Sequence, residues 1–177
     1  IEICREIRNR NLDIAWQAEA RANTVTDLVA AEMAKAGCHH VQIGAESGDN
    51  EILKKIGKNV TTDTIERAVR IFLKHGITVV CSFILGHPDD TAETCEKTIR
   101  FGKYLKTISG GYTSCKFAIL TPLPGTPVYE RKDDLGIKLL TENWDNYTFF
   151  DTVMETKNLN RRQLQNLYMK AWATYAS

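Results

Sequence analysis

Hydrophobic residues follow two alternating patterns along this chain. The run Ile77–Leu85 is almost continuously apolar, which is typical of a strand covered on both faces. Shorter apolar runs predict further strands over Leu12–Ala18, Val41–Ala45 and Ser114–Leu120. Between these runs the apolar residues recur at i, i+3, i+4 and i+7, which is the period of an amphipathic helix.

The clearest helix is predicted from Asp63 to His75. Its apolar face consists of Ile65, Ala68, Val69, Phe72 and Leu73. Thr62 or Asp63 can cap the first turn, and Gly76 ends the helix because glycine readily adopts the left-handed conformation found at helix ends.

Further helices are predicted on either side of this one. Thr26–Ala36 has Leu28 on its apolar face, and Asp49–Ile56 forms a short helical turn. Asp90 is expected to cap a helix that continues to about Leu105. Near the end of the chain comes a strongly amphipathic helix, Arg161–Tyr175, whose apolar face includes Leu164, Leu167, Tyr168, Ala171, Trp172 and Tyr175.

The order of the elements predicts an α/β fold. Helical segments between apolar strands imply a parallel sheet with right-handed crossovers. About four strands are too few for a closed eight-stranded barrel, so we expect a partial (β/α) barrel with flanking helices. Residues 1–131 form this part, and residues 132–177 form an extension that carries the last helix.

Composition narrows the functional classes. The 177 residues carry a net charge of +1, which favours neither a nucleic-acid partner nor a membrane surface. No apolar run approaches the roughly 20 residues of a membrane span. The chain begins at Ile1 within a helical pattern, so we expect it to be a piece of a longer protein.

The cysteines argue against a metal site or a disulfide framework made by this chain alone. They are odd in number and widely spaced, and no C-x-x-C or C-x-x-x-C pair is present. This usage fits a reducing, cytoplasmic setting with small buried thiols. The five residues are Cys4, Cys38, Cys81, Cys95 and Cys115.

Four polar clusters follow the predicted strands. They are Gln17–Arg21, Glu46–Gly48, Gly86–Asp90 and Thr121–Gly125. Parallel strands place such clusters on one edge of a sheet, where ligand sites form. Carboxylates accept hydroxyl hydrogen bonds, and small residues let a flat ring approach the backbone, so the set suits a nucleoside with a charged tail.

Each cluster also has a structural explanation. Glu46 can simply cap the following turn, and Asp90 a helix. Arg21 can form a surface salt bridge of little energetic value. His39 and His40 are expected at the opposite edge of the sheet, so a metal role does not follow.

Five segments together resemble the radical S-adenosylmethionine superfamily. They are Trp16–Arg21, Ala36–Gly48, Ile52–Lys58, Phe83–Thr91 and Leu120–Pro127. Their sequences are most similar to those of the cobalamin-binding branch, which includes methyltransferases and anaerobic magnesium-protoporphyrin monomethyl ester cyclases. The resemblance covers about residues 1–131 and corresponds to strands three to six of a six-stranded partial barrel.

The resemblance implies cofactor-binding roles for five polar residues. Glu19 matches an acidic residue that contacts the nucleoside ribose, and Arg21 a basic residue beside it. Glu46 lies where the family places a ribose-contacting side chain, with Ser47 next to it. Lys58 matches a basic residue near the carboxylate of S-adenosylmethionine.

It also implies a site for the adenine ring. Ile84 and Gly86 match the fifth-strand motif G-x-I-x-G-x-x-E, although Ser82 replaces its first glycine. Leu120 and Thr121 match the sixth-strand position on the other side of the ring. No catalytic residue and no metal ligand is assigned.

The family holds a [4Fe–4S] cluster on a C-x-x-x-C-x-x-C loop, which this sequence lacks. The resemblance therefore implies that the cluster ligands lie outside this chain, that any cobalamin belongs to a further domain, and that this chain is inactive alone. Its partners would be the missing N-terminal part of the same protein and an unidentified small-molecule substrate. Without that part, the first strand would be an open edge, so self-association of the chain is expected.

Two other interpretations remain open. A transfer-RNA methylthiotransferase is disfavoured because those proteins usually have Gln and Arg where this chain has Glu46 and Lys58. A non-catalytic β/α scaffold or partner-binding module fits the cysteine spacing equally well. A C-x-x-x-C-x-x-C sequence upstream of Ile1 would favour the enzyme. The sequence does not reveal the substrate.

Overall fold

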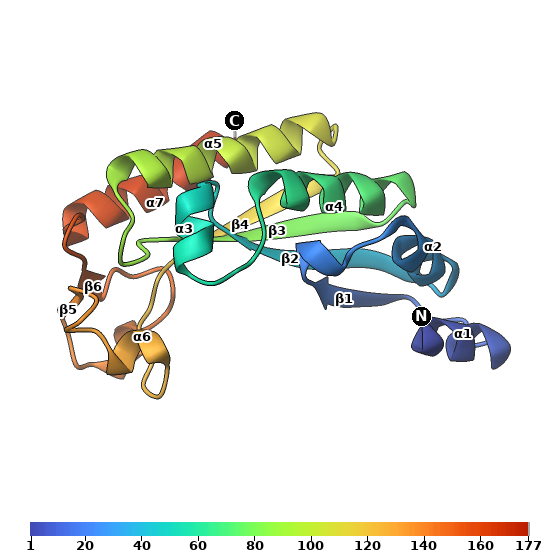
Figure 1. Cartoon of the computed structure of the whole chain (residues 1–177), viewed down its shortest axis with the longest axis horizontal. Coiled ribbons are helices and arrows are strands. Elements are labelled where there is room, and N and C mark those ends of the chain that lie inside the picture. The colour runs from blue at the N-terminus through green and yellow to red at the C-terminus, as the bar shows by residue number, and fades with distance from the viewer. Residues whose placement is uncertain (177) are drawn as a thin grey trace. The chain divides into compact units, whose positions relative to one another are not determined.

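The computed structural model describes residues 1–176 and contains a four-stranded parallel sheet (Figure 1). Its strands are β1 (Trp16–Ala20), β2 (Cys38–Glu46), β3 (Thr78–Leu85) and β4 (Thr113–Ile119). They follow one another in chain order, β1-β2-β3-β4. The α/β prediction with four parallel strands is therefore confirmed.

No helix of the described residues is long and apolar enough to cross a membrane.

Helices alternate with the strands as the periodicity indicated. The helices are α1 (Glu2–Asn9), α2 (Asp27–Lys35), α3 (Asn50–Lys55), α4 (Thr62–Lys74), α5 (Ala92–Ile108), α6 (Pro127–Glu130) and α7 (Arg161–Ala176), with short 3-10 turns η1 (Ala22–Thr24) and η2 (Trp144–Asn146).

The described residues group into two compact units. The first consists of residues 1–45, 59–82 and 104–116. The second consists of residues 46–58, 83–103 and 117–177, so it holds the carboxyl ends of β2, β3 and β4.

In the first unit, one face of the sheet and one face of α4 form the core. Val41 and Ile43 of β2 are fully buried, while the intervening Gln42 is partly exposed, as the alternation of a strand requires. From α4, Ile65 and Phe72 are fully buried. Helices α1 and α2 pack on each other, and so do α2 and α4 (Figure 1).

In the second unit, aromatic rings and α7 fill the core. The Phe83 ring stacks on Phe117, with centroids 5.4 Å apart, and meets Phe101 edge-on at 6.1 Å. Leu164, Leu167, Tyr168 and Ala171 of α7 are buried as predicted, but Trp172, expected on the same face, is 38% exposed. The side chain of Tyr175, expected on the same face, lies outside those described.

The first strand begins later than predicted. Leu12 was expected to start it, but Leu12 and Ile14 are exposed and pairing with β2 begins at Trp16. The Trp16 indole donates to the Ala36 carbonyl at 2.7 Å, and the Trp16 N–H donates to the Gly37 carbonyl at 3.1 Å. These bonds fix the start of β1 at the end of α2.

Three predictions about the helices are wrong in detail. The cap of α4 is Thr61, whose hydroxyl accepts the Thr64 N–H at 3.2 Å, and not Thr62 or Asp63. Leu28 is exposed, because α2 turns other residues inward. Asp90 does not cap α5: Thr91 accepts the Thr94 N–H instead, at 3.3 Å.

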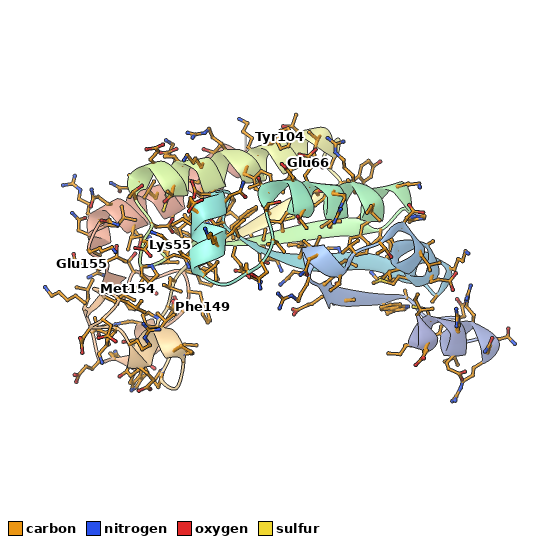
Figure 2. The ribbon with its side chains drawn as sticks, viewed as in Figure 1. Lys55, Glu66, Tyr104, Phe149, Met154 and Glu155 are labelled. Carbon is orange, nitrogen blue, oxygen red and sulfur yellow. The ribbon has the colours of Figure 1, made fainter. Side chains whose placement is uncertain are left out.

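The extension contains a hairpin that periodicity did not reveal. Strands β5 (Lys138–Leu139) and β6 (Met154–Glu155, labelled in Figure 2) pair antiparallel. Two residues are too few to show an alternating pattern. The Glu155 carboxylate then accepts the Arg161 N–H at 3.0 Å, which anchors the start of α7.

Gly48 packs too closely against α5 to accept a side chain. An added Cβ would lie 2.7 Å from the Thr98 Cα and 2.9 Å from the Lys97 carbonyl oxygen, both backbone atoms of α5. Gly48→Ala should lower the free energy of unfolding by about 1–3 kcal/mol, or prevent folding, because α5 must shift.

The matched control for this substitution is Gly57→Ala. Gly57 has φ +71° but open space around it, so only backbone strain of roughly 1–2 kcal/mol is expected there. Urea denaturation of both variants checks this, and a larger loss for Gly57→Ala would contradict the proposed close packing of Gly48 on α5.

Candidate functional site

The second unit gathers the carboxyl ends of three parallel strands. Glu46 is the last residue of β2, Gly86 follows β3, and Leu120 and Thr121 follow β4. The Leu120 N–H donates to the Leu85 carbonyl at 2.9 Å, so the sheet pairing continues up to the first residue after β4. These four predicted site residues therefore belong to one unit.

An ion pair lies at the end of β2. The Lys58 ammonium is 2.7 Å from a Glu46 carboxylate oxygen, and the two side chains are 28% and 17% exposed. Lys58 lies just past the end of α3, and its backbone N–H donates to the Leu53 carbonyl of that helix at 3.1 Å. This bond holds the Lys58 side chain near the end of β2. Glu46 has φ +64°, a left-handed conformation that costs energy for a residue with a side chain.

Ser47 is held in a structural network. Its hydroxyl lies 3.1 Å from the Thr98 hydroxyl and accepts the Asp49 N–H at 3.1 Å. The Gly48 N–H also donates to Thr98, at 2.9 Å. Ser47 is buried, so it fixes the turn after β2 against α5.

A buried carboxylate holds the turn after β3. One oxygen of Asp90 accepts the N–H of Gly86 at 3.0 Å and of His87 at 2.9 Å, and the other accepts the Thr94 hydroxyl at 2.6 Å. Gly86 has φ +89°, and a Cβ there would approach Leu164 to 2.8 Å. The turn therefore needs glycine for both its conformation and its contact with α7.

His87 connects this turn to the end of β2. It is 6% exposed, and its ring donates a hydrogen bond to the Glu46 backbone carbonyl. Its Nε2 atom is buried with no hydrogen-bond partner among the described residues. Burial lowers the pKa of His87 below its ordinary value, although the nearby carboxylates of Asp90 and Glu46 act in the opposite direction.

A pocket of 390 Å³ lies beside these residues. It is largely apolar, with Lys55 (Figure 2), Asp89 and Arg131 as its charged residues. A hydrogen bond from Lys157 lowers the pKa of Asp89, and Lys55 adds to the effect. The other residues around it are Ile52, Ile56, His87, Pro88, Leu120, Pro127, Val128 and Leu135.

The remaining predicted site residues lie in β1, directly after β1, or within β3. Glu19 is exposed on β1 in the first unit and lines a polar pocket of 360 Å³ that also contains His40. Arg21 is exposed directly after β1. Ile84 is partly exposed on β3. His40 lies in the amino-terminal half of β2, away from Glu46 at its carboxyl end.

The cysteines do not fit an iron–sulfur cluster. All five are buried, and the described residues contain no group of three that could hold a metal ion. Burial raises the pKa of Cys115 to about 12 and raises the pKa values of Cys81 and Cys95 as well. Cluster ligation requires thiolates, and this burial favours the neutral thiol.

Sequence reasoning missed the linking roles of His87 and Asp90. The signal was present, because a carboxylate four residues after a glycine that ends a strand can reach back to the exposed N–H groups of the turn. Nothing in the sequence indicated that Thr98, 51 residues after Ser47, would bond to it.

The buried imidazole predicts a stability that depends on pH. Below about pH 6.5 the unfolded chain binds a proton at His87 that the folded chain does not, because the folded pKa is lowered. Stability should therefore fall as the pH decreases, by up to about 1.4 kcal/mol per pH unit.

The variant His87→Asn isolates this titration. Asparagine can still donate to the Glu46 carbonyl but does not titrate. Urea denaturation at about pH 7.5 and about pH 5.5 should show a smaller loss of stability for His87→Asn than for the wild type. Equal losses would mean that His87 does not cause the pH dependence.

The Radical SAM superfamily model matches residues 1–102. An uncharacterised methyltransferase of Pyrococcus horikoshii is 39% identical over 175 residues, which cover 99% of this chain and 37% of the relative. An anaerobic magnesium-protoporphyrin IX monomethyl ester cyclase of Rubrivivax gelatinosus is 27% identical over 180 residues, which cover 99% of this chain and 30% of that protein. The chain thus spans about a third of the length of these relatives.

A solved structure shares the fold. The radical S-adenosylmethionine methyltransferase TsrM from Kitasatospora setae, solved with cobalamin and a [4Fe–4S] cluster bound, has a TM-score of 0.63 at 23% identity. The match covers 80% of this chain and 28% of that chain. Because the family model matches more than half of the sequence, the chain belongs to the radical S-adenosylmethionine superfamily.

Proposed function

We propose that this chain supplies the nucleoside-binding side of the active site in a cobalamin-type radical S-adenosylmethionine methyltransferase. The observation that carries the proposal is the gathering of three strand ends in the second unit, where the Glu46–Lys58 ion pair adjoins the tight turn at Gly86. Parallel α/β folds bind ligands at such strand ends.

Each polar residue has a proposed contact with S-adenosylmethionine. Glu46 accepts a ribose hydroxyl, and Lys58 pairs with the carboxylate of the cofactor. Ser47 supports Glu46 through its bonds to α5. Glu19 and Arg21 belong to the first unit, and each keeps its own proposed role in cofactor binding.

The adenine ring is proposed to lie against apolar and backbone atoms. Ile84 and Gly86 form one side, and Leu120 and Thr121 the other. The Asp90 carboxylate keeps the Gly86 turn in place, so the backbone that the ring meets is fixed before binding.

The remaining cofactors are proposed to come from outside this chain. Together with a reduced [4Fe–4S] cluster, S-adenosylmethionine supplies a radical or a methyl group. The buried thiols described here do not fit the cluster, so the chain alone is proposed to be inactive. Cobalamin is likewise assigned to another domain, and the protein to the cytoplasm.

Methyl transfer is favoured over oxidative cyclisation. The relative from Pyrococcus horikoshii, which is 39% identical, is named a methyltransferase. The 27% identical cyclase of Rubrivivax gelatinosus makes radical cyclisation the second candidate.

The proposal predicts that Glu46→Gln weakens the binding of S-adenosylmethionine. A hydrogen bond to a charged group contributes about 1.5–3 kcal/mol, so the dissociation constant should rise by roughly tenfold or more. Equilibrium dialysis with labelled S-adenosylmethionine measures this. The control is Glu51→Gln, which removes the same charge from an exposed position on α3. Equal affinity of wild type and Glu46→Gln would exclude Glu46 as the ribose contact.

A second prediction concerns the iron–sulfur cluster. The 177-residue chain, reconstituted anaerobically with iron and sulfide, should take up no [4Fe–4S] cluster, because its thiols are buried and scattered. Absorbance at about 400 nm, where thiolate-bound clusters absorb, measures uptake. Stoichiometric absorbance there would contradict the assignment of the ligands to another part of the protein.

A further inference from the structure

Three aromatic side chains of the second unit, from α6 and from around η2, line a further pocket. Tyr129, Trp144 and Tyr147 line a space of 820 Å³, within the range of small-molecule sites. The Trp144 ring centroid lies 4.7 Å from that of Tyr147 and 6.2 Å from that of Tyr129. All lie beyond the residues 1–102 that the family model matches, so the pocket is not part of the matched region.

Local hydrogen bonds hold these rings in place. Asn143 caps η2 by accepting the Asp145 N–H at 3.1 Å, which fixes the backbone at Trp144. The Tyr147 hydroxyl donates to the Thr141 carbonyl at 2.9 Å. Trp144 is nevertheless 52% exposed, although burying a large aromatic ring of this kind would be favourable. A fixed, exposed indole offers a stacking surface at little entropic cost.

The charges around the pocket are asymmetric. The Lys132 ammonium lies 5.1 Å from the centroid of the Tyr129 ring and pairs with no carboxylate among residues 1–176. Glu142 lies toward Tyr147, where it contributes to the raised pKa of that phenol after burial and Tyr129. A cation is therefore available at the Tyr129 end of the pocket for an anionic group.

The pocket segment is attached to the end of β4. The Ile119 N–H donates to the carbonyl of Phe149 (labelled in Figure 2) at 2.8 Å, and Leu120 and Thr121 follow immediately. Phe149 adopts φ +66°, so the segment keeps a strained residue at this attachment. The chain that leaves the aromatic pocket after Tyr147 is thus hydrogen-bonded to the strand whose end carries the proposed adenine contacts.

We propose that this aromatic pocket binds the substrate, and that the substrate is a flat conjugated ring system bearing a carboxylate. The ring stacks on Trp144, and the carboxylate pairs with Lys132. The inference rests on the proposed function, because the ring is the acceptor of that reaction, but binding can be measured without turnover.

The probes are protoporphyrin IX, which has two carboxylates, and its dimethyl ester, which has none. Fluorescence anisotropy of each probe is titrated with the 177-residue chain. Trp144→Ala should weaken the binding of both probes by about tenfold, because it removes the stacking surface. Trp172→Ala, which removes another exposed tryptophan in the same unit, should leave both affinities within twofold.

Lys132→Gln provides the second test. It should weaken the binding of the acid several-fold and leave the ester unchanged, a difference that a loss of folding would not produce. Equal losses for Trp144→Ala and Trp172→Ala, no binding by the wild type, or an equal effect of Lys132→Gln on both probes would overturn the inference.

The same variants separate this inference from the proposed function. If porphyrin binding fails these tests while Glu46→Gln still weakens S-adenosylmethionine binding, only the substrate class is wrong. If porphyrin binding behaves as expected while Glu46→Gln has no effect, the aromatic pocket stands and the cofactor assignment fails.

Discussion

The Asp90 carboxylate is the constraint on which the arrangement of the site depends. A strand that ends in a tight turn exposes backbone N–H groups, and burying them without partners would cost free energy. Asp90 accepts two of these groups and is itself buried, so the turn after β3 has a single geometry. That geometry places the His87 ring against the Glu46 carbonyl, and so connects the ends of two strands.

Glu46 shows why this connection matters. A left-handed conformation is unfavourable for glutamate and persists only where neighbouring interactions fix it. Two interactions do so: the His87 ring holds its carbonyl and Lys58 holds its carboxylate. This conformation keeps a charged side chain at the strand end, where a ligand can meet it. The alternative that the sequence also allowed, a Glu46 that only caps the following turn, is not what the structure shows, because the Glu46 carboxylate pairs with Lys58.

The sequence predicted the sheet well because burial on both faces leaves apolar runs that no loop would carry, as in Ile77–Leu85. It failed where side chains bond to backbone across short distances. Thr61, Thr62 and Asp63 are all good caps, and only the geometry selects Thr61. Asp90 likewise precedes a helix but serves the turn before it. The bond between Ser47 and Thr98 depends on how α5 packs, which no local pattern encodes.

The two parts of the second unit meet different physical requirements. The turns after β2 and β3 contain buried hydrogen bonds and a glycine that tolerates no side chain, so most substitutions there would disturb the strand ends proposed to bind the cofactor. The segment from Tyr129 to Tyr147 carries one exposed ring, Trp144, and two partly exposed rings, and local bonds hold them. The residues that follow this segment meet β4 through a backbone hydrogen bond from Ile119 to Phe149. A backbone bond does not depend on side-chain identity. Under the proposed assignment, the residues that contact a substrate can therefore vary while the strand ends that contact the cofactor stay fixed.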